Sequence, residues 1–177
     1  MGSGSGVVGH FELNTSLDEA QRARYQDPNV IRNLIERSRT IAVVGLSADR
    51  QKASFFVASY LRSEGYRIIP VNPRGGEILG ETVYPDLRAV PAKIDIVDIF
   101  RPTVEVAGIV DQAIAVGARA VWMQLRIIDF AAADRALAAG LAVVIDKCVK
   151  MEHGRFGGSL HWAGMNTEIV SARKARR

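Results

Sequence analysis

The chain alternates between short apolar runs and segments of helical periodicity, and this alternation limits the folds open to it. Three glycines, Gly65, Gly117 and Gly140, stand where helical stripes end and new apolar runs begin. Helix, glycine and strand in repetition are typical of parallel βαβ units, whose right-handed crossovers put helices on both faces of a sheet. The sequence therefore predicts an α/β, Rossmann-like doubly wound fold, with a mainly parallel five-stranded sheet. The predicted strands are Ile41–Gly45, Arg67–Val71, Asp95–Ile99, Arg119–Gln124 and Leu141–Asp146.

Three segments between these runs carry a single apolar stripe, as helices packed on a sheet do. In the first, Ala53, Phe56, Val57, Tyr60 and Leu61 share one helical face; Val106–Ile114 and Phe130–Ala138 show similar spacing. Ahead of the sheet, Asp27 and Pro28 suit the N-cap and first position of another helix. We expect that helix to pack across the sheet or against a partner subunit, so a homo-oligomer is compatible with the sequence.

The remaining segments set the domain boundaries. Pro73–Pro91 is rich in proline and glycine, which predicts a long loop with a short helical turn near Asp86–Ala89. After Lys150 no clear period remains, so loops or a short edge strand are expected. Residues 1–6 resemble a cloning remnant. The predicted division is a flexible N-terminal tail at 1–26, one nucleotide-binding domain at 27–165 and a basic C-terminal tail at 166–177.

Composition narrows the class of protein. Apolar residues make up 48% and charged residues 24% of the 177, the balance of a globular chain. No run approaches the roughly 18 apolar residues of a membrane span, and no signal peptide is evident, so a cytoplasmic location is expected. Cys148 is the only cysteine and the three histidines are scattered, so neither a disulfide nor a metal site is expected. The basic end, Arg173–Arg177, lacks interleaved aromatic residues, so no nucleic-acid partner is expected.

The loop after the first strand is the first candidate site. Ligands of doubly wound sheets bind at the carboxyl ends of the strands, where the winding direction reverses. With an expected strand order of 3-2-1-4-5, that crevice lies between the first and fourth strands. Gly45 allows a close backbone approach, Ser47 and Ser54 offer hydroxyl donors, and a helix N-terminus follows, as a phosphate site requires. The alternative is an ordinary strand–helix turn with Ser54 as its N-cap.

The loop after the second strand bears on the kind of nucleotide. An NAD site favours an acidic residue there, to hold the ribose hydroxyls. This chain has Asn72, Pro73 and Arg74 instead. The charge of Arg74 favours a phosphorylated ribose, which both NADP and coenzyme A carry. The alternative is that Asn72 and Pro73 simply shape a turn.

Residues after the third and fourth strands complete the candidate cleft. Phe100 is suited to lie against an adenine ring, Arg101 to pair with phosphate, and Gln124 to reach across the cleft toward the first loop. The sequence has no nucleophile elbow and no close pair of carboxylates in the predicted cleft. Binding without catalysis is therefore the expected role. Cys148 is either a reactive thiol beside Lys147 and Lys150 or a small packed side chain.

Taken in order, five motifs make the chain resemble the small single-domain coenzyme A-binding proteins. Their fold is similar to the N-terminal coenzyme A-binding domain of the succinyl-CoA synthetase α subunit. The likeness covers about Asn29 to Gly164. The motifs are Ile41-Ala-Val-Val-Gly-Leu-Ser47, Val71-Asn-Pro73, Asp95-Ile-Val-Asp-Ile-Phe-Arg101, Val121-Trp-Met-Gln-Leu125 and Asp146-Lys-Cys-Val-Lys-Met-Glu-His153.

The resemblance implies a non-catalytic module that binds coenzyme A or an acyl-CoA across the strand ends. It implies pyrophosphate contacts from Gly45, Ser47, Lys52 and Ser54. The adenosine end would lie near Asn72, Pro73, Arg74, Phe100 and Arg101, and the pantetheine arm near Gln124.

One residue departs from the pattern: the family usually has glycine where this chain has Arg126, a long side chain that would narrow the pantetheine channel. Two other functions stay open. One is an NADP-dependent oxidoreductase or other nucleotide-binding Rossmann protein, favoured by Arg74. The other is a redox partner that forms a mixed disulfide between Cys148 and the coenzyme A thiol.

Overall fold

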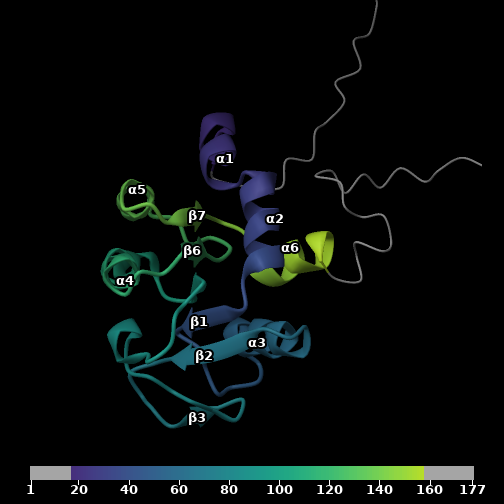
Figure 1. Ribbon diagram of the computed structural model, residues 1–177, viewed down its shortest axis with the longest axis vertical. Helices are drawn as coiled ribbons and strands as arrows, with labels where there is room; N and C mark the ends of the chain where they lie inside the picture. The colour runs from purple at the N-terminus through teal and green to yellow at the C-terminus, as the bar shows by residue number, and fades with distance from the viewer. Residues whose placement is uncertain (1–16, 158–177) are drawn as a thin grey trace, which may run out of the picture.

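The computed structural model describes residues 17–157, and these form one parallel sheet between two layers of helices (Figure 1). All pairings between the five main strands are parallel, and the strands lie in the order β2-β1-β5-β6-β7. The predicted α/β, doubly wound class is confirmed. The strands are β1 (Thr40–Val44), β2 (Arg67–Val71), β5 (Ile96–Ile99), β6 (Ala120–Met123) and β7 (Ala142–Val144).

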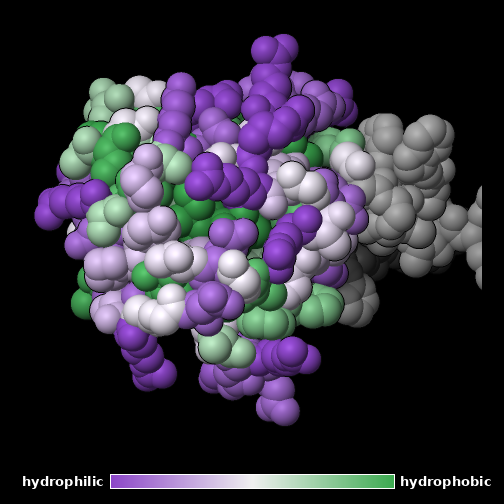
Figure 2. Space-filling view, turned by 60° about the horizontal axis from the view of Figure 1, so that its bottom comes forward, coloured by the Kyte–Doolittle hydropathy of each residue, from purple (hydrophilic) through white to green (hydrophobic). Residues whose placement is uncertain are grey.

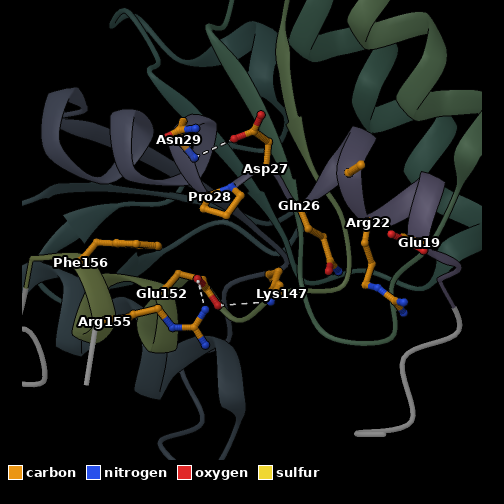
Figure 3. A pocket seen from close by; sticks show the side chains of 11 residues that line it. Glu19, Arg22, Gln26, Asp27, Pro28, Asn29, Lys147, Glu152, Arg155 and Phe156 are labelled. Carbon is orange, nitrogen blue, oxygen red and sulfur yellow. Dashed lines mark hydrogen bonds and ion pairs between the residues drawn. The ribbon is translucent and has the colours of Figure 1, made fainter. Parts of the chain in front are cut away.

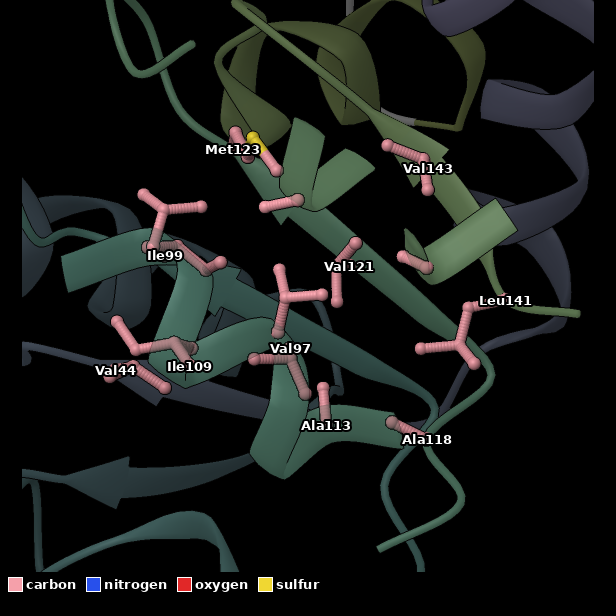
Figure 4. Packing of buried hydrophobic residues seen from close by; sticks show 14 of the residues in the cluster. Val44, Val97, Ile99, Ile109, Ala113, Ala118, Val121, Met123, Leu141 and Val143 are labelled. Atoms are coloured by element: carbon pink, nitrogen blue, oxygen red, sulfur yellow. The ribbon is translucent and has the colours of Figure 1, made fainter. Parts of the chain in front are cut away.

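Helices cover both faces of the sheet. On one face lie α4 (Thr103–Ala115) and α5 (Phe130–Ala138); on the other lie α2 (Pro28–Arg37), α3 (Ala53–Ser63) and α6 (Val149–Phe156) (Figure 1). Side chains alternate along each strand, so each face has its own apolar cluster. Figure 4 shows the cluster under α4 and α5, where residues such as Val97, Val121 and Ile109 meet.

The expected order of the strands is wrong. The third long strand, β5, pairs with β1 and not with β2, so the order of the five is 2-1-3-4-5. The outer edge of β2 is instead taken by the loop that follows it, where Tyr84 forms an isolated parallel bridge with Val71. The Tyr84 N–H donates to the Pro70 carbonyl and the Asn72 N–H to the Tyr84 carbonyl, at 2.9 Å each. The winding direction therefore reverses between β1 and β5.

The long loop is confirmed in outline. Its expected helical turn is a 3₁₀ segment, Leu87–Ala89, N-capped by Asp86. The loop also holds a small antiparallel hairpin of β3 (Glu77–Ile78) and β4 (Glu81–Thr82), which composition alone did not predict. Further along, the expectation of loops or an edge strand after Lys150 is wrong, because α6 runs there.

The stripe predicted for α3 is wrong at two positions. Ala53 is exposed and Phe56 is 60% exposed, whereas Val57, Ala58 and Leu61 form the buried side with Ser54. The helix is thus rotated slightly from the expected orientation. The predicted helix at Asp27 is confirmed: Asp27 caps α2 and Pro28 is its first residue. Ile31, Leu34 and Ile35 are buried in the apolar cluster that α2 shares with the sheet, α3 and α6.

The N-terminal part assigned to a flexible tail contains α1 (Glu19–Tyr25), which opens on a capping box between Asp18 and Gln21. The Tyr25 hydroxyl donates to Asp134 of α5 at 2.6 Å, so α1 is attached to the folded domain. The predicted basic tail, 166–177, lies outside the described residues.

On the face shown in Figure 2, hydrophilic side chains surround a smaller hydrophobic area. Within residues 17–157, no helix has the length and apolar character needed to cross a membrane.

Candidate functional site

The turn after β1 is built around Gly45. Its φ is +88°, a backbone conformation that residues other than glycine rarely adopt. Its N–H donates to the Val71 carbonyl at 2.8 Å. A Cβ at this position would lie 2.6 Å from the Phe100 carbonyl oxygen and 2.7 Å from Cδ of Arg101. Glycine is therefore required for the turn after β1 to pass this close to the end of β5.

The two serines hold the turn against the start of α3. The Ser47 N–H donates to Oγ of buried Ser54 at 3.2 Å, and Oγ of Ser47 accepts from the Asp49 N–H at 3.1 Å. Ser54 is not the N-cap as the alternative supposed; the cap is Lys52, which offers no side-chain hydrogen bond to the helix end. The first amides of α3 thus keep their capacity to bind an anion.

The loop after β2 is both a turn and a link to the first loop. Oδ1 of Asn72 accepts from the Arg74 N–H at 3.0 Å, which is the turn-shaping role the alternative proposed. Nδ2 of the same side chain donates to the Leu46 carbonyl at 3.0 Å and so ties the two loops together. Across residues 17–157, no carboxylate is paired with Arg74 or Lys52, and both side chains are exposed.

These loops enclose a cavity of about 500 Å³, termed here the loop cavity. It adjoins the ends of β1, β2 and β5, next to the point where the winding direction reverses. Nine of the ten residues predicted from the sequence line it. The lining residues are Gly45, Ser47, Lys52, Ala53, Ser54, Asn72, Pro73, Arg74, Phe100 and Arg101.

Arg101, predicted to pair with phosphate, pairs with a carboxylate of the chain itself. Its Nε and Nη2 donate to both carboxylate oxygens of Glu105, at 2.8 and 2.6 Å, one helical turn along. The pair is half-exposed, and the hydrogen bonds to Glu105 raise the pKa of Arg101 and lower that of Glu105. Arg101 therefore reaches the cavity as a member of an ion pair and not as a free cation.

Gln124 lies in a different place from the other predicted residues. Its amide Nε2 donates to Oδ1 of Asp98 at 2.7 Å, so this group is directed to β5 and not across the cleft to the first loop. Gln124 lines a second cavity, of about 420 Å³, with Ala53, Phe100 and Arg101, which also line the loop cavity. Most of its other walls are apolar, from Val57, Pro102, Leu125, Ile127 and Cys148, and we term it the apolar cavity.

Asp98 is the main polar residue that sequence reasoning missed. It is completely buried, and its Oδ2 has no hydrogen-bond partner among the described residues. Burial raises the pKa of Asp98 to about 7, and the hydrogen bond from Gln124 offsets only part of that effect. The available signal was a carboxylate in the middle of an otherwise apolar strand run.

Two further residues reach the apolar cavity. Arg126 is exposed and has a φ of +64°; its N–H donates to Oδ1 of Asp146 at 2.7 Å. Cys148 is half-buried at the N-cap of α6. Arg126, where the family usually has glycine, thus adopts a left-handed backbone conformation, which glycine adopts more easily than other residues.

A cavity of about 540 Å³ lies elsewhere, between α1, the start of α2 and α6 (Figure 3). Its buried carboxylate, Glu152, is flanked by Lys147 at 3.7 Å and Arg155 at 3.4 Å. Lys147 and Arg155 are thus engaged by an internal carboxylate, whereas Lys52 and Arg74 of the loop cavity have no carboxylate partner in residues 17–157. The loop cavity is the better anion site.

Comparison with known proteins gives the family of the chain. A family model described as a CoA binding domain matches residues 39–154. The uncharacterized protein YneT of Bacillus subtilis (strain 168) is 33% identical over 123 residues, covering 70% of this chain and 91% of that protein.

Solved structures are similar as well. A hypothetical protein from Pyrococcus horikoshii OT3 is 36% identical with a TM-score of 0.71, covering 73% of this chain and 91% of that one. A dinucleotide-forming acetyl-coenzyme A synthetase from Ca. Korarchaeum cryptofilum is 27% identical with a TM-score of 0.55. That match covers 63% of this chain and 26% of the synthetase.

Proposed function

The chain belongs to the CoA-binding domain family, and from that premise we propose that it binds coenzyme A, or an acyl-CoA, as a binding module that does not turn it over. The ligand's phosphates lie in the loop cavity, and its pantetheine arm extends into the apolar cavity.

The observation that carries the proposal is the charge and donor pattern of the loop cavity. Lys52 and Arg74 approach it without carboxylate partners in the described part of the chain, and the N-terminus of α3 has no side-chain cap. Helix N-termini and free cations together favour phosphate groups. The aromatic ring of Phe100, at the border of the two cavities, offers a surface for the adenine or for the arm.

The non-catalytic role is supported by the chemistry of the lining. Within residues 17–157, no carboxylate or histidine lines either of these cavities, so neither has an acid–base pair. Two carboxylates are hydrogen-bonded to side chains of the lining: Asp98, which is buried, accepts from Gln124, and Glu105 accepts from Arg101. Cys148 supplies the one thiol in their lining.

Replacing Arg74 with alanine tests where the ribose phosphate binds. The Arg74→Ala variant is expected to bind coenzyme A about tenfold or more weakly, because a charge-assisted contact is lost. Its affinity for dephospho-coenzyme A should change little. Isothermal titration with the two ligands measures both. Arg67→Ala, at an exposed arginine that begins β2, is the matched control, because β2 separates it from the loop that holds Arg74. Equal losses for the two ligands would contradict an Arg74–phosphate contact.

An NADP-dependent oxidoreductase is the second candidate, favoured by the same arginine. NADP also carries a ribose phosphate, so Arg74 alone does not distinguish the two. The apolar cavity does favour coenzyme A, because a flexible pantetheine arm fits it better than a second, charged nucleotide half. Quenching or enhancement of NADPH fluorescence on mixing would favour the reductase.

A further inference from the structure

The lining of the apolar cavity includes a cation that has no carboxylate partner among residues 17–157. The cavity is lined by two charged side chains, Arg101 and Arg126. Arg101 is held by Glu105, as described above. Arg126 is exposed, and no carboxylate of residues 17–157 is within ion-pair distance of it. A guanidinium thus stands beside apolar walls with its charge available to a ligand.

The backbone at Arg126 does not need this side chain. Its φ of +64° is the left-handed conformation, which costs a residue with a Cβ more than it costs glycine. The turn is secured through the backbone, by the 2.7 Å hydrogen bond from the Arg126 N–H to Asp146. Any residue able to adopt this φ would make the same bond. The side chain is therefore placed here at a conformational cost that the fold does not require.

The phosphates of the coenzyme do not account for Arg126. The loop cavity already supplies Lys52, Arg74 and the N-terminus of α3 for them, and Arg126 does not line it. In the apolar cavity, Val57, Leu125 and Ile127 provide walls for methylene groups, and Arg126 provides a donor pair at their edge. A guanidinium binds a carboxylate through two parallel hydrogen bonds.

We propose that Arg126 makes the protein selective for CoA thioesters of short dicarboxylic acids, whose terminal carboxylate pairs with its guanidinium while the acyl methylenes lie on the apolar walls. The proposal rests on the proposed function, since the thioester reaches this cavity only when the coenzyme is bound. It names a class of acyl group, because free coenzyme A and simple fatty acyl thioesters have no terminal carboxylate to pair with Arg126.

Titration with three ligands tests the proposal. Succinyl-CoA and butyryl-CoA have acyl groups of equal carbon number and differ in the terminal carboxylate; free coenzyme A is the third ligand. The wild-type protein is expected to bind succinyl-CoA about tenfold more tightly than butyryl-CoA. In Arg126→Gly this preference should disappear, and the titration with free coenzyme A measures separately how removal of the side chain affects the pantetheine arm in the same cavity. The Tm of Arg126→Gly should not fall, because glycine adopts this φ without strain.

Two results would overturn the proposal while leaving the proposed function intact. One is equal affinity of the wild-type protein for succinyl-CoA and butyryl-CoA. The other is a variant that weakens all three ligands by the same factor, which would mean that Arg126 contacts the coenzyme itself. Failure of free coenzyme A to bind the wild-type protein would overturn both proposals together.

Discussion

Replacing Gly45 with alanine should weaken coenzyme A binding by about tenfold or more and lower the free energy of unfolding by roughly 1–3 kcal/mol. The added Cβ would meet the Phe100 carbonyl oxygen at 2.6 Å, and a backbone atom cannot move aside as a flexible side chain can. The residue would also keep a φ of +88° that alanine disfavours. Either the turn or the end of β5 must move, and both line the loop cavity. Urea unfolding and titration with coenzyme A measure the two effects.

Gly65 supplies the matched control. It has a φ of +95°, but a Cβ there would meet nothing within 4 Å, and it lies between α3 and the start of β2, at the other end of the sheet. Gly65→Ala should therefore lower stability through its φ alone and leave coenzyme A binding unchanged. If Gly45→Ala bound coenzyme A as tightly as the wild-type protein, the turn would not be the phosphate site.

The Asp98→Asn variant should be stabilised relative to the wild-type protein as the pH rises. Burial raises the pKa of Asp98 from 3.8 to about 7, so the folded state retains a proton that the unfolded state has lost. The wild-type protein should lose stability as the pH rises from about 4 through about 7, because the folded state then binds more protons than the unfolded state. Asparagine cannot ionise, so the difference between variant and wild type should grow by about 2–3 kcal/mol between pH 5 and pH 8.

Asp95 is a control with the opposite sign. Burial acts to raise its pKa, but hydrogen bonds from the Arg39 and Thr40 N–H groups and from Arg119 outweigh that effect and lower it. A group with a lowered pKa contributes stability that is lost on acidification, so Asp95→Asn should reduce the loss of stability in acid. Urea unfolding at a series of pH values measures both variants. A pH-independent difference between Asp98→Asn and the wild-type protein would show that Asp98 is ionised at pH 5.

Much of the fold follows from local sequence features. The glycines at 65, 117 and 140 have φ values of +95°, +68° and +87°, which is the physical reason they mark the ends of the helices. The order of the strands did not follow, because it depends on a long-range choice. Whether β5 joins β2 or β1 is decided where Tyr84 occupies the free edge of β2, and no periodicity records that contact.

In the candidate site, too, local features were predictable from the sequence and long-range contacts were not. The convergence of residues that directly follow strands was predictable, because parallel strands bring their carboxyl ends to one edge. Nine of the predicted residues meet in the loop cavity for this reason. Pairings between side chains were not predictable: the Arg101–Glu105 ion pair and the Gln124–Asp98 hydrogen bond depend on rotamers and tertiary contacts. α6 was missed because its short, mostly polar sequence has little apolar stripe to detect.

The measurement that decides most is native mass spectrometry of the protein offered an equimolar mixture of coenzyme A, NADP and NADPH. If the loop cavity holds the phosphates and the apolar cavity the pantetheine arm, the spectrum will show the protein with one coenzyme A and no dinucleotide adduct. Gly45→Ala in the same mixture should lose that adduct. A protein that takes up NADP or NADPH in preference, or that takes up none of the three, would contradict the assignment of the site.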